Sequence, residues 1–376
     1  IKVNSSRAMK AHIIYANFLK PDGNGLNIGG IETYIMNLSD VLYEMGFAVN
    51  IYQRGDVDFE KKYGNYGVIG VVNKNIHTFK YDIFNACAQR CNKTEDLIIF
   101  ASEEFIIKKD GYNTIGIQHG ISWDIPNISK NNYLKTYLNK AFRAWVRISR
   151  VNKVKTMVCV DYNFINWYRA LTAYPKTQLV AIPNFTNIPD VVDIERNHFE
   201  YIEIIFARRF QPYRGTRIFA SAVERILSEF SNVRVTFAGE GPDEQYLRNI
   251  FKDNSRVTLM KYESAESLAI HSTKHIAVVP TVGSEGTSLS LLEAMAAGCA
   301  VVATNVGGMT NIILDHYNGL LINADEDSIY YALKELISNE AIRKTIAEKG
   351  RETVIAGFSL ERWKNSWKRV VNKSMK

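Results

Sequence analysis

The stretch G-S-E-G-T-S-L-S-L-L-E-A-M-A-A-G-C-A-V-V-A-T-N, residues 283–305, decides the fold of this chain. It follows an apolar run at 276–280 that predicts a strand. A loop with two glycines then leads into a helical pattern, for which Thr287 or Ser288 is a good N-cap. A second apolar run at 300–304 predicts the next strand. A helix between two such strands is the unit of a parallel sheet covered on both faces.

The same alternation continues along all 376 residues. Short apolar or β-rich runs predict strands at 10–15, 48–52, 68–72, 96–100, 114–117, 156–160, 179–182, 201–206, 233–238, 257–260, 276–280, 300–304 and 319–322. Helical patterns lie between most of them. We therefore predict an α/β protein with two doubly wound domains, which agrees with a length of about two domains. Such folds bind ligands at the carboxyl ends of their strands, here in a cleft between the domains.

Composition narrows the class of protein. Apolar residues make up 46% and charged residues 23%, which is a globular mix and excludes a disordered or collagen-like chain. The longest apolar runs, such as 97–101, are much shorter than the about 20 residues of a spanning helix. Four cysteines make no disulfide framework in a chain of this length, and we find no secretion signal. We therefore expect a cytoplasmic protein.

One segment accounts for the net charge of +7. Residues 130–155 hold eight basic side chains and no acidic one. Residues 129–150 have the periodicity of a helix with one apolar stripe, formed by Leu134, Tyr137, Leu138, Ala141, Phe142, Trp145 and Ile148. Two interpretations stay open. The stripe faces the core of the first domain and the charges are solvated, or 129–155 docks on an anionic membrane surface.

The glycine-bearing loop at 283–288 carries the most informative chemistry. The unpaired amides at the start of a helix form an anion site that suits a diphosphate. Glu285 lies in the loop, and Glu293 lies in a nearly apolar helix, where an unpaired carboxylate would be costly. A carboxylate accepts two hydrogen bonds from a vicinal diol, and a nucleotide sugar offers such diols on its ribose and its hexose.

The segments E-G-T-S-L-S-L-L-E-A-M-A-A-G, A-V-V-A-T-N-V-G-G and N-G-L-L-I together resemble the E-x7-E donor site of the family 4 retaining glycosyltransferases, which have the GT-B fold. The resemblance covers the C-terminal half strongly and the N-terminal half weakly. It implies that Glu285 contacts hydroxyls of the donor hexose and that Glu293 binds the ribose. The diphosphate-binding backbone would be that of Gly286, Thr287, Ser288 and Leu289.

A second motif, F-A-R-R-F-Q-P-Y-R-G, follows the first strand of the second half and covers residues 206–215. Arg209 and Arg214 lie five residues apart across a turn, so both can reach one diphosphate. The family has G-R-L…K-G here. Arg209 matches its arginine, Arg214 replaces its lysine and retains the charge, and Arg208 replaces its glycine without an evident reason.

The first half carries two weaker motifs. Gly29 and Gly30 precede a helix and let the backbone approach a phosphate. With Glu32 they match the family's G-G-x-E loop, which faces the donor diphosphate across the cleft. His119 ends a predicted strand in Q-H-G and resembles the family's H-D or H-G loop. This implies that His119 positions the acceptor hydroxyl or the donor hexose.

Two patterns suggest a metal, and we expect none there. Asp56 and Asp58 form a D-x-D, the metal motif of the other large glycosyltransferase fold, but they lie in what we predict to be a solvated charged loop with Glu60, Lys61 and Lys62. Cys87 and Cys91 lack a second pair of ligands, which zinc would need.

The resemblance implies domains at 9–185 for the acceptor and 201–357 for the donor. A linker at 186–200 would join them, and a helix at 358–376 would pack back on the first domain. The implied reaction moves a hexose from a nucleotide diphosphate sugar, UDP-linked, to a glycan or lipid-linked acceptor. It retains configuration, needs no metal or cofactor, involves no nucleic acid, and serves bacterial cell-surface polysaccharide synthesis (O-antigen, capsule or exopolysaccharide). A peripheral place on the inner face of the plasma membrane would suit it.

Two alternatives from other functional classes stay open. One is a sugar-nucleotide epimerase of similar fold, and the other is a nucleotide-sugar-binding module without turnover. An NAD-dependent reductase is disfavoured because no G-x-G-x-x-G follows the first strand.

Overall fold

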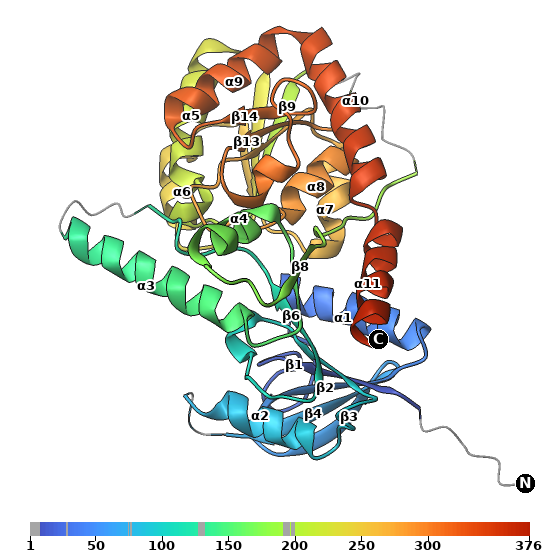
Figure 1. Ribbon diagram of the computed structural model, residues 1–376. Coiled ribbons are helices and arrows are strands. Elements are labelled where there is room, and N and C mark those ends of the chain that lie inside the picture. Colours follow the sequence, from blue (N-terminus) through green and yellow to red (C-terminus); the bar gives the residue numbers. More distant parts are fainter. Residues whose placement is uncertain are drawn as a thin grey trace, which may run out of the picture.

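Two parallel β-sheets, each covered by helices, form the framework of the computed structural model, and the chain passes from the lower sheet to the upper one (Figure 1). The structure describes residues 8–27, 29–73, 75, 77–126, 132–190, 196 and 200–376. The predicted linker at 186–200 thus lies partly outside the described residues, at 191–195 and 197–199. The domain boundaries stay a prediction.

The strands are short and mostly buried. Within the described residues, the N-terminal sheet contains β1 (Lys10–Ile14), β2 (Ala48–Gly55), β3 (Phe59–Tyr63), β4 (Tyr66–Val72), β5 (Leu97–Phe100), β6 (Asn113–Gln118), β7 (Thr156–Cys159) and β8 (Gln178–Ala181). The C-terminal sheet contains β9 (Ile202–Ala207), β10 (Val233–Ala238), β11 (Val257–Met260), β12 (Ile276–Val279), β13 (Ala300–Thr304) and β14 (Leu320–Ile322). These strands confirm the predicted α/β class with two parallel-sheet domains.

Helices pack on both faces of each sheet. Those of the first half are α1 (Gly30–Glu44), α2 (Phe79–Ala88), α3 (Tyr133–Val151) and α4 (Tyr162–Leu171). Those of the second half are α5 (Thr216–Glu229), α6 (Glu244–Phe251), α7 (Ser267–Ser272), α8 (Leu289–Ala296), α9 (Glu326–Ser338), α10 (Glu340–Gly357) and α11 (Leu360–Ser374). None of these described helices combines the length and the apolar character that crossing a bilayer requires.

Strand order determines where a ligand fits. The N-terminal sheet has the order β3-β4-β2-β1-β5-β6-β7-β8 and the C-terminal sheet β11-β10-β9-β12-β13-β14. The direction of winding reverses between β1 and β5 in the first sheet and between β9 and β12 in the second. Ligands of doubly wound sheets bind beyond the carboxyl ends of the strands at such a reversal. Arg208 follows β9 there, and Thr281 lies just beyond β12.

The prediction of a solvated charged loop holds for Asp56 and Asp58, which are exposed between two strands, but it is wrong for Glu60 and its neighbours. Residues 59–63 form β3, which pairs antiparallel with β4 at the edge of the sheet. The three consecutive charged residues lie on an edge strand with one neighbouring strand, where charge discourages pairing with other chains. Asp58 of the D-x-D accepts a hydrogen bond from the backbone of Val72 at 2.8 Å, which is a structural role in this edge hairpin.

The C-terminal helix returns to the first domain. α11 packs against α1 and therefore belongs to the lower body in Figure 1. The indole of Trp367, which is fully buried, donates a hydrogen bond to the hydroxyl of Tyr34 at 3.0 Å. Lys364 and Lys368 of α11 form ion pairs with Glu44 of α1.

The interpretation that the apolar stripe of 129–150 faces the core is wrong for most of the stripe. Ile148 is buried, together with Ala144 and Val151, but the earlier stripe residues of α3 are exposed. The predicted start of the helix, 129–131, lies outside the described residues. Periodicity predicts that a helix is amphipathic, but it does not predict what covers the apolar face.

Candidate active site

A buried ion cluster lies at the strand reversal of the C-terminal sheet. Glu285, in the loop between β12 and α8, accepts hydrogen bonds from Arg208 at 2.6 Å and from Arg214 at 2.5 Å. The hydroxyl of Thr281 donates to the same carboxylate oxygen at 2.9 Å and accepts from Arg208. The sequence pattern gives no reason for Arg208, which replaces a glycine. In the structure, this arginine holds Glu285 in place.

The two arginines keep Glu285 ionised. Burial alone would raise the pKa of Glu285, but the charges and hydrogen bonds of Arg208 and Arg214 outweigh it and lower the pKa. Burial also lowers the pKa of Arg208, although the nearby carboxylate opposes that effect. A buried pair of this kind stays charged only when hydrogen bonds satisfy its lone pairs and protons, as here.

Local backbone geometry brings Arg214 to the cluster. Arg214 ends a one-turn 3-10 helix, Pro212–Arg214, and Gly215 follows with a positive φ of 81°. A Cβ on Gly215 would lie 1.9 Å from the carbonyl oxygen of Pro280. Only glycine therefore lets this turn pack under the end of β12. That packing places Arg214 beside the glycine-bearing loop at 283–288, which we call the donor loop.

Arg209 has a different environment. Its side chain is exposed and has no hydrogen-bond or ion-pair partner within the part of the chain that the structure describes. It adjoins Arg208 in sequence, at the end of β9. The structure therefore joins Arg214 to Glu285 and leaves the guanidinium of Arg209 available to an anion.

The first turn of α8 lies where the sequence predicts an anion site. Ser288 is the N-cap, and its hydroxyl accepts a hydrogen bond from the backbone of Leu291. Across the cleft, a Cβ on Gly30 would lie 3.8 Å from Leu289. Gly30 begins α1, so the amino ends of α1 and α8 approach each other from opposite domains. Two helix amino ends near one point favour a bound anion.

Contacts between the two domains surround the donor loop. A Cβ on Gly286 would lie 3.0 Å from the carbonyl oxygen of His119, so a side chain there would push the domains apart. Thr287 donates from its hydroxyl to the carbonyl of Val160. The backbone of Ser284 donates to the carboxylate of Asp124 at 2.8 Å. The loop thus touches the first domain along most of its length.

His119 is half-buried and uncharged at neutral pH. Burial lowers its pKa to about 4, against a weaker opposite effect of its hydrogen bond to Ala101. Nε2 lies 2.7 Å from the carbonyl oxygen of Ala101, so we assign the proton to Nε2 and an acceptor lone pair to Nδ1. The ring also makes an edge contact with Tyr34, at 5.1 Å between centroids. This arrangement suits a group that receives a hydrogen bond from a hydroxyl.

The G-G-x-E loop is held by its own glutamate. Gly29 is the N-cap of α1 in an extended conformation, and a Cβ there would lie 2.3 Å from the Glu32 carboxylate. Glu32 is buried and accepts a hydrogen bond from the hydroxyl of Tyr15 at 3.0 Å. Glu32 therefore supports the loop from inside the first domain.

Glu293 lies in the second turn of α8, half-buried beside α7. It accepts a hydrogen bond from the hydroxyl of Ser267. Burial raises its pKa to about 7, and the hydrogen bond from Ser267 only partly opposes this effect. Hydrogen-bond donors of a bound ligand would lower the pKa of such a carboxyl and favour its ionised form.

Glu293→Gln is expected to stabilise the ligand-free protein at pH 8 and to weaken nucleotide binding. The pKa rises on folding from its usual 4.5 to about 7, so stability is lost as the pH rises through that range. Glutamine resembles the protonated form, and its gain in melting temperature should therefore shrink between pH 8 and pH 5. Thermal melts at both pH values and titration with a nucleoside diphosphate measure the two effects.

The control for this variant is Glu240→Gln, because the side chain of Glu240 is 69% exposed. It should change neither quantity. Near-normal affinity for nucleoside diphosphates in Glu293→Gln would eliminate the ribose role that the resemblance implies.

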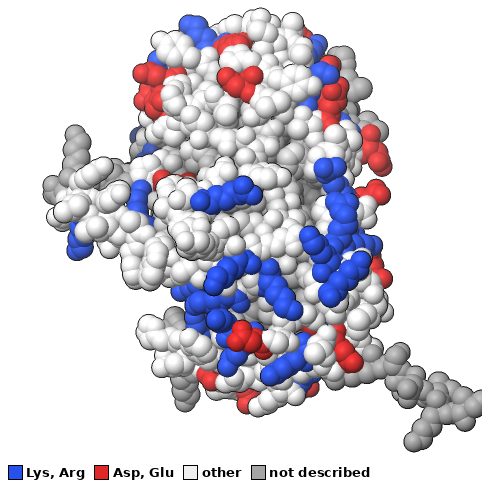
Figure 2. Space-filling model, in the orientation of Figure 1, with Lys and Arg blue, Asp and Glu red and all other residues white. Residues whose placement is uncertain are grey.

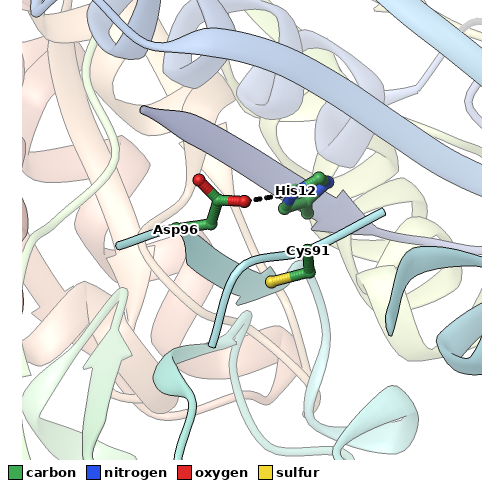
Figure 3. A group of neighbouring side chains, drawn as sticks. All are labelled: His12, Cys91 and Asp96. Atoms are coloured by element: carbon green, nitrogen blue, oxygen red, sulfur yellow. Dashed lines mark hydrogen bonds and ion pairs between the residues drawn. The ribbon is translucent and has the colours of Figure 1, made fainter. Parts of the chain in front are cut away.

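A group of metal-type side chains lies at the opposite end of the first sheet (Figure 3). His12, Cys91 and Asp96 bring ligand atoms within 4.8 Å of one another. However, Asp96 accepts from His12 at 3.4 Å and from the backbone of Lys10 and Asn92. These hydrogen bonds already use its oxygens. We interpret the group as a structural link between β1 and β5, which agrees with three ligands being too few for structural zinc.

A cavity of about 410 Å³ lies between β14 and α9, and its lining includes Asp315, His316 and Glu335. None of the predicted site residues lines it. The candidate site is instead the place where the loops of the two domains meet.

The residues that sequence reasoning missed are those that hold the motif residues. Arg208 and Thr281 fix Glu285, Ser267 contacts Glu293, and Asp124 contacts the donor loop. The sequence does mark Arg208 as unusual, because this arginine replaces a glycine in the pattern of the family. The others carry no local pattern.

Comparison with known proteins agrees with the fold. Residues 202–339 match the family model described as Glycosyl transferases group 1. The Uncharacterized glycosyltransferase MJ1178 of Methanocaldococcus jannaschii is 31% identical over 180 residues, which cover 47% of this chain and 49% of that protein. This chain therefore matches about half the length of that relative.

Solved structures extend the likeness to the whole fold. Sucrose-phosphate synthase from Thermosynechococcus elongatus superposes with a TM-score of 0.76 at 17% identity, over 97% of this chain and 98% of that one. Anabaena Alr3699/HepE, solved in complex with UDP and glucose, superposes with a TM-score of 0.71 at 14% identity. The superposition covers 97% of this chain and 99% of that one. This chain therefore has the GT-B fold, and its residues 202–339 match the model of the group 1 glycosyltransferases.

Proposed function

We propose that this chain is a retaining glycosyltransferase that moves a hexose from a UDP-sugar to a hydroxyl of a glycan or lipid-linked acceptor. The observation that carries the proposal is the charge at the strand reversal. Arg208, Arg209 and Arg214 with Glu285 have a net formal charge of +2. A diphosphate diester carries about two negative charges, and charge-assisted hydrogen bonds from arginine suit its oxygens.

In this proposal, each element of the site binds one part of the donor. The diphosphate lies between Arg209, Arg214 and the first turn of α8, facing Gly30 of the first domain. Glu293 contacts the ribose and Glu285 the hexose. The relative HepE was solved with UDP and glucose, which supports UDP as the nucleotide.

The reaction proceeds on one face of the sugar. The bond between the anomeric carbon and the diphosphate oxygen breaks, and the acceptor oxygen bonds to the same face of that carbon. The departing phosphate oxygen takes the acceptor proton. Nδ1 of His119 accepts a hydrogen bond that orients a hydroxyl, and the pKa of about 4 makes His119 a positioning group rather than the base. Fixed positive charge stabilises the leaving group.

These arginines and the helix dipole supply the charge that a divalent cation supplies in other transferases. We therefore propose a metal-independent reaction, located on the cytoplasmic side of cell-surface polysaccharide assembly. Turnover should be unchanged in EDTA. A requirement for magnesium or manganese would contradict the metal-independent reaction.

The test of the proposal is a panel of UDP-glucose, UDP-N-acetylglucosamine and GDP-mannose. Binding is measured by thermal shift, since a ligand at 100 times its dissociation constant stabilises by about 2.7 kcal/mol. Consumption of donor without acceptor is then followed. Slow hydrolysis of the donor supports a transferase, whereas isomerisation of the donor indicates an epimerase. Binding without consumption of the donor, even during long incubation with acceptors, would contradict the proposal that the chain is an enzyme.

A further inference from the structure

The outer half of α3 exposes a continuous apolar surface, which we call the α3 patch. It consists of six large side chains at 57–82% exposure: Tyr133, Leu134, Tyr137, Leu138, Phe142 and Trp145. Soluble proteins rarely expose so many large apolar side chains on one helix, and such patches usually mark an interaction site. Figure 1 shows this half of α3 extending beyond both sheets.

The charges of the helix lie on the opposite side. At about 100° per residue, the α3 patch fills about half of the circumference of α3. Lys135, Lys140 and Arg143 lie in the other half, with Lys135 and Lys140 near its two borders. No acidic residue lies between Asp124 and Asp161 in the sequence. The helix is therefore amphipathic with a purely basic polar face.

The inner half of α3 anchors this surface. Ala144, Ile148 and Val151 are buried against the first domain. Arg147 donates to the buried carboxylate of Glu103 at 2.7 Å, so this arginine serves the anchor rather than the exposed surface. The C-terminal half of α3 thus packs on the first domain, and the α3 patch on its N-terminal half extends away from that domain.

The surrounding surface has the same sign. Figure 2 shows Lys and Arg gathered across the middle of this face, between α3 and α11, whereas both signs mix at the upper end of the C-terminal domain. An apolar face with basic borders fits the boundary between lipid tails and anionic headgroups, where lysine stems reach along the apolar layer. A second copy of this chain would bring like charges together.

We propose that residues 133–145 are a docking helix for anionic lipid, with the α3 patch inserted between headgroups and Lys135 and Lys140 beside phosphates. This goes beyond the proposed glycosyltransfer and does not depend on it. The helix follows Asp124, which contacts the donor loop at Ser284. Docking through α3 therefore holds the cleft close to the lipid surface, where a lipid-linked acceptor would be.

Co-sedimentation with vesicles of phosphatidylcholine, with and without phosphatidylglycerol, tests the proposal. We expect binding to the mixed vesicles, weakened by salt, and little binding to phosphatidylcholine alone. Leu138→Ser/Phe142→Ser should lower the partition coefficient roughly tenfold or more. Lys135→Glu/Lys140→Glu should lower it by at least about tenfold, since each basic residue contributes about fivefold.

Matched controls sit far from α3. Leu314→Ser/Tyr331→Ser removes two apolar side chains that are 65% and 63% exposed, and Lys252→Glu/Lys261→Glu makes the same charge change elsewhere. Both should bind like the parent. Melting temperatures should stay near that of the parent in all four variants, because every substituted side chain is exposed except that of Lys140, which is half-buried.

Trp145 gives a second readout, because its fluorescence should shift to the blue with mixed vesicles and the shift should disappear in Trp145→Phe. Equal binding to neutral and anionic vesicles, or parent-like binding of either α3 variant, would overturn the proposal. A lipid-free oligomer that Leu138→Ser/Phe142→Ser dissociates, together with no vesicle binding, would assign the α3 patch to a second copy instead.

Discussion

Arg214→Ala and Arg209→Ala are each expected to lower kcat about a hundredfold, the usual effect of removing one preorganised donor from a developing oxyanion. Arg214 contacts Glu285 at 2.5 Å, so its loss removes positive charge from the diphosphate and one of the two arginines that hold the carboxylate. Arg209 has no protein partner within the described residues, and its effect should therefore come from the ligand alone. Initial rates of donor consumption with acceptor measure both.

Arg248→Ala is the matched control, because Arg248 is 55% exposed and its ion pair with Glu244 lies within one turn of α6. It should retain parent activity. Arg214→Lys should recover part of the rate, since charge remains while the planar fork is lost. A kcat within threefold of the parent in Arg209→Ala or Arg214→Ala would remove that arginine from the site.

Continuous apolar strands were the most predictable part of the fold. β10, β11 and β13 begin and end where their sequence patterns predict, because each is a short run of mostly β-branched or apolar residues, and β13 is buried along its whole length. β3 was missed for the opposite reason. Its sequence F-E-K-K-Y has charged residues that suit an edge strand, and composition alone makes such a segment look like a loop.

The site was predictable where backbone chemistry determines it. Gly30 and Ser288 mark helix starts through local rules, and the structure brings Gly30 opposite α8. The partners of the charged residues were not predictable. The contacts of Glu285 with Arg208 and of Ser284 with Asp124 join residues 77 and 160 positions apart, and only the packed domains bring them together. Whether the stripe of α3 is covered is a tertiary property for the same reason.

The largest expected effect on stability is that of Trp367→Ala, which should lower the free energy of unfolding of the N-terminal domain by about 3–5 kcal/mol. Trp367 is fully buried, and its indole donates to Tyr34. The variant leaves a cavity and removes a donor from a buried hydroxyl. Denaturant titration followed by circular dichroism measures the loss, with Ile355→Ala on the exposed face of α10 as the control. A loss below about 1 kcal/mol would mean that α11 does not depend on this anchor.

The same variant should also affect the site. Tyr34 lies between α11 and the catalytic cleft, with ring contacts of 6.2 Å to Trp367 and 5.1 Å to His119. A Tyr34 ring without its support no longer fixes the orientation of His119, so KM for the acceptor should rise while nucleotide affinity stays near the parent value. Glu285, Glu293 and the first turn of α8, which we propose to bind the nucleotide sugar, lie on the C-terminal domain, whose core does not include Trp367. A helix from the end of the chain thus stabilises the fold of the first domain and positions the histidine that faces the donor loop.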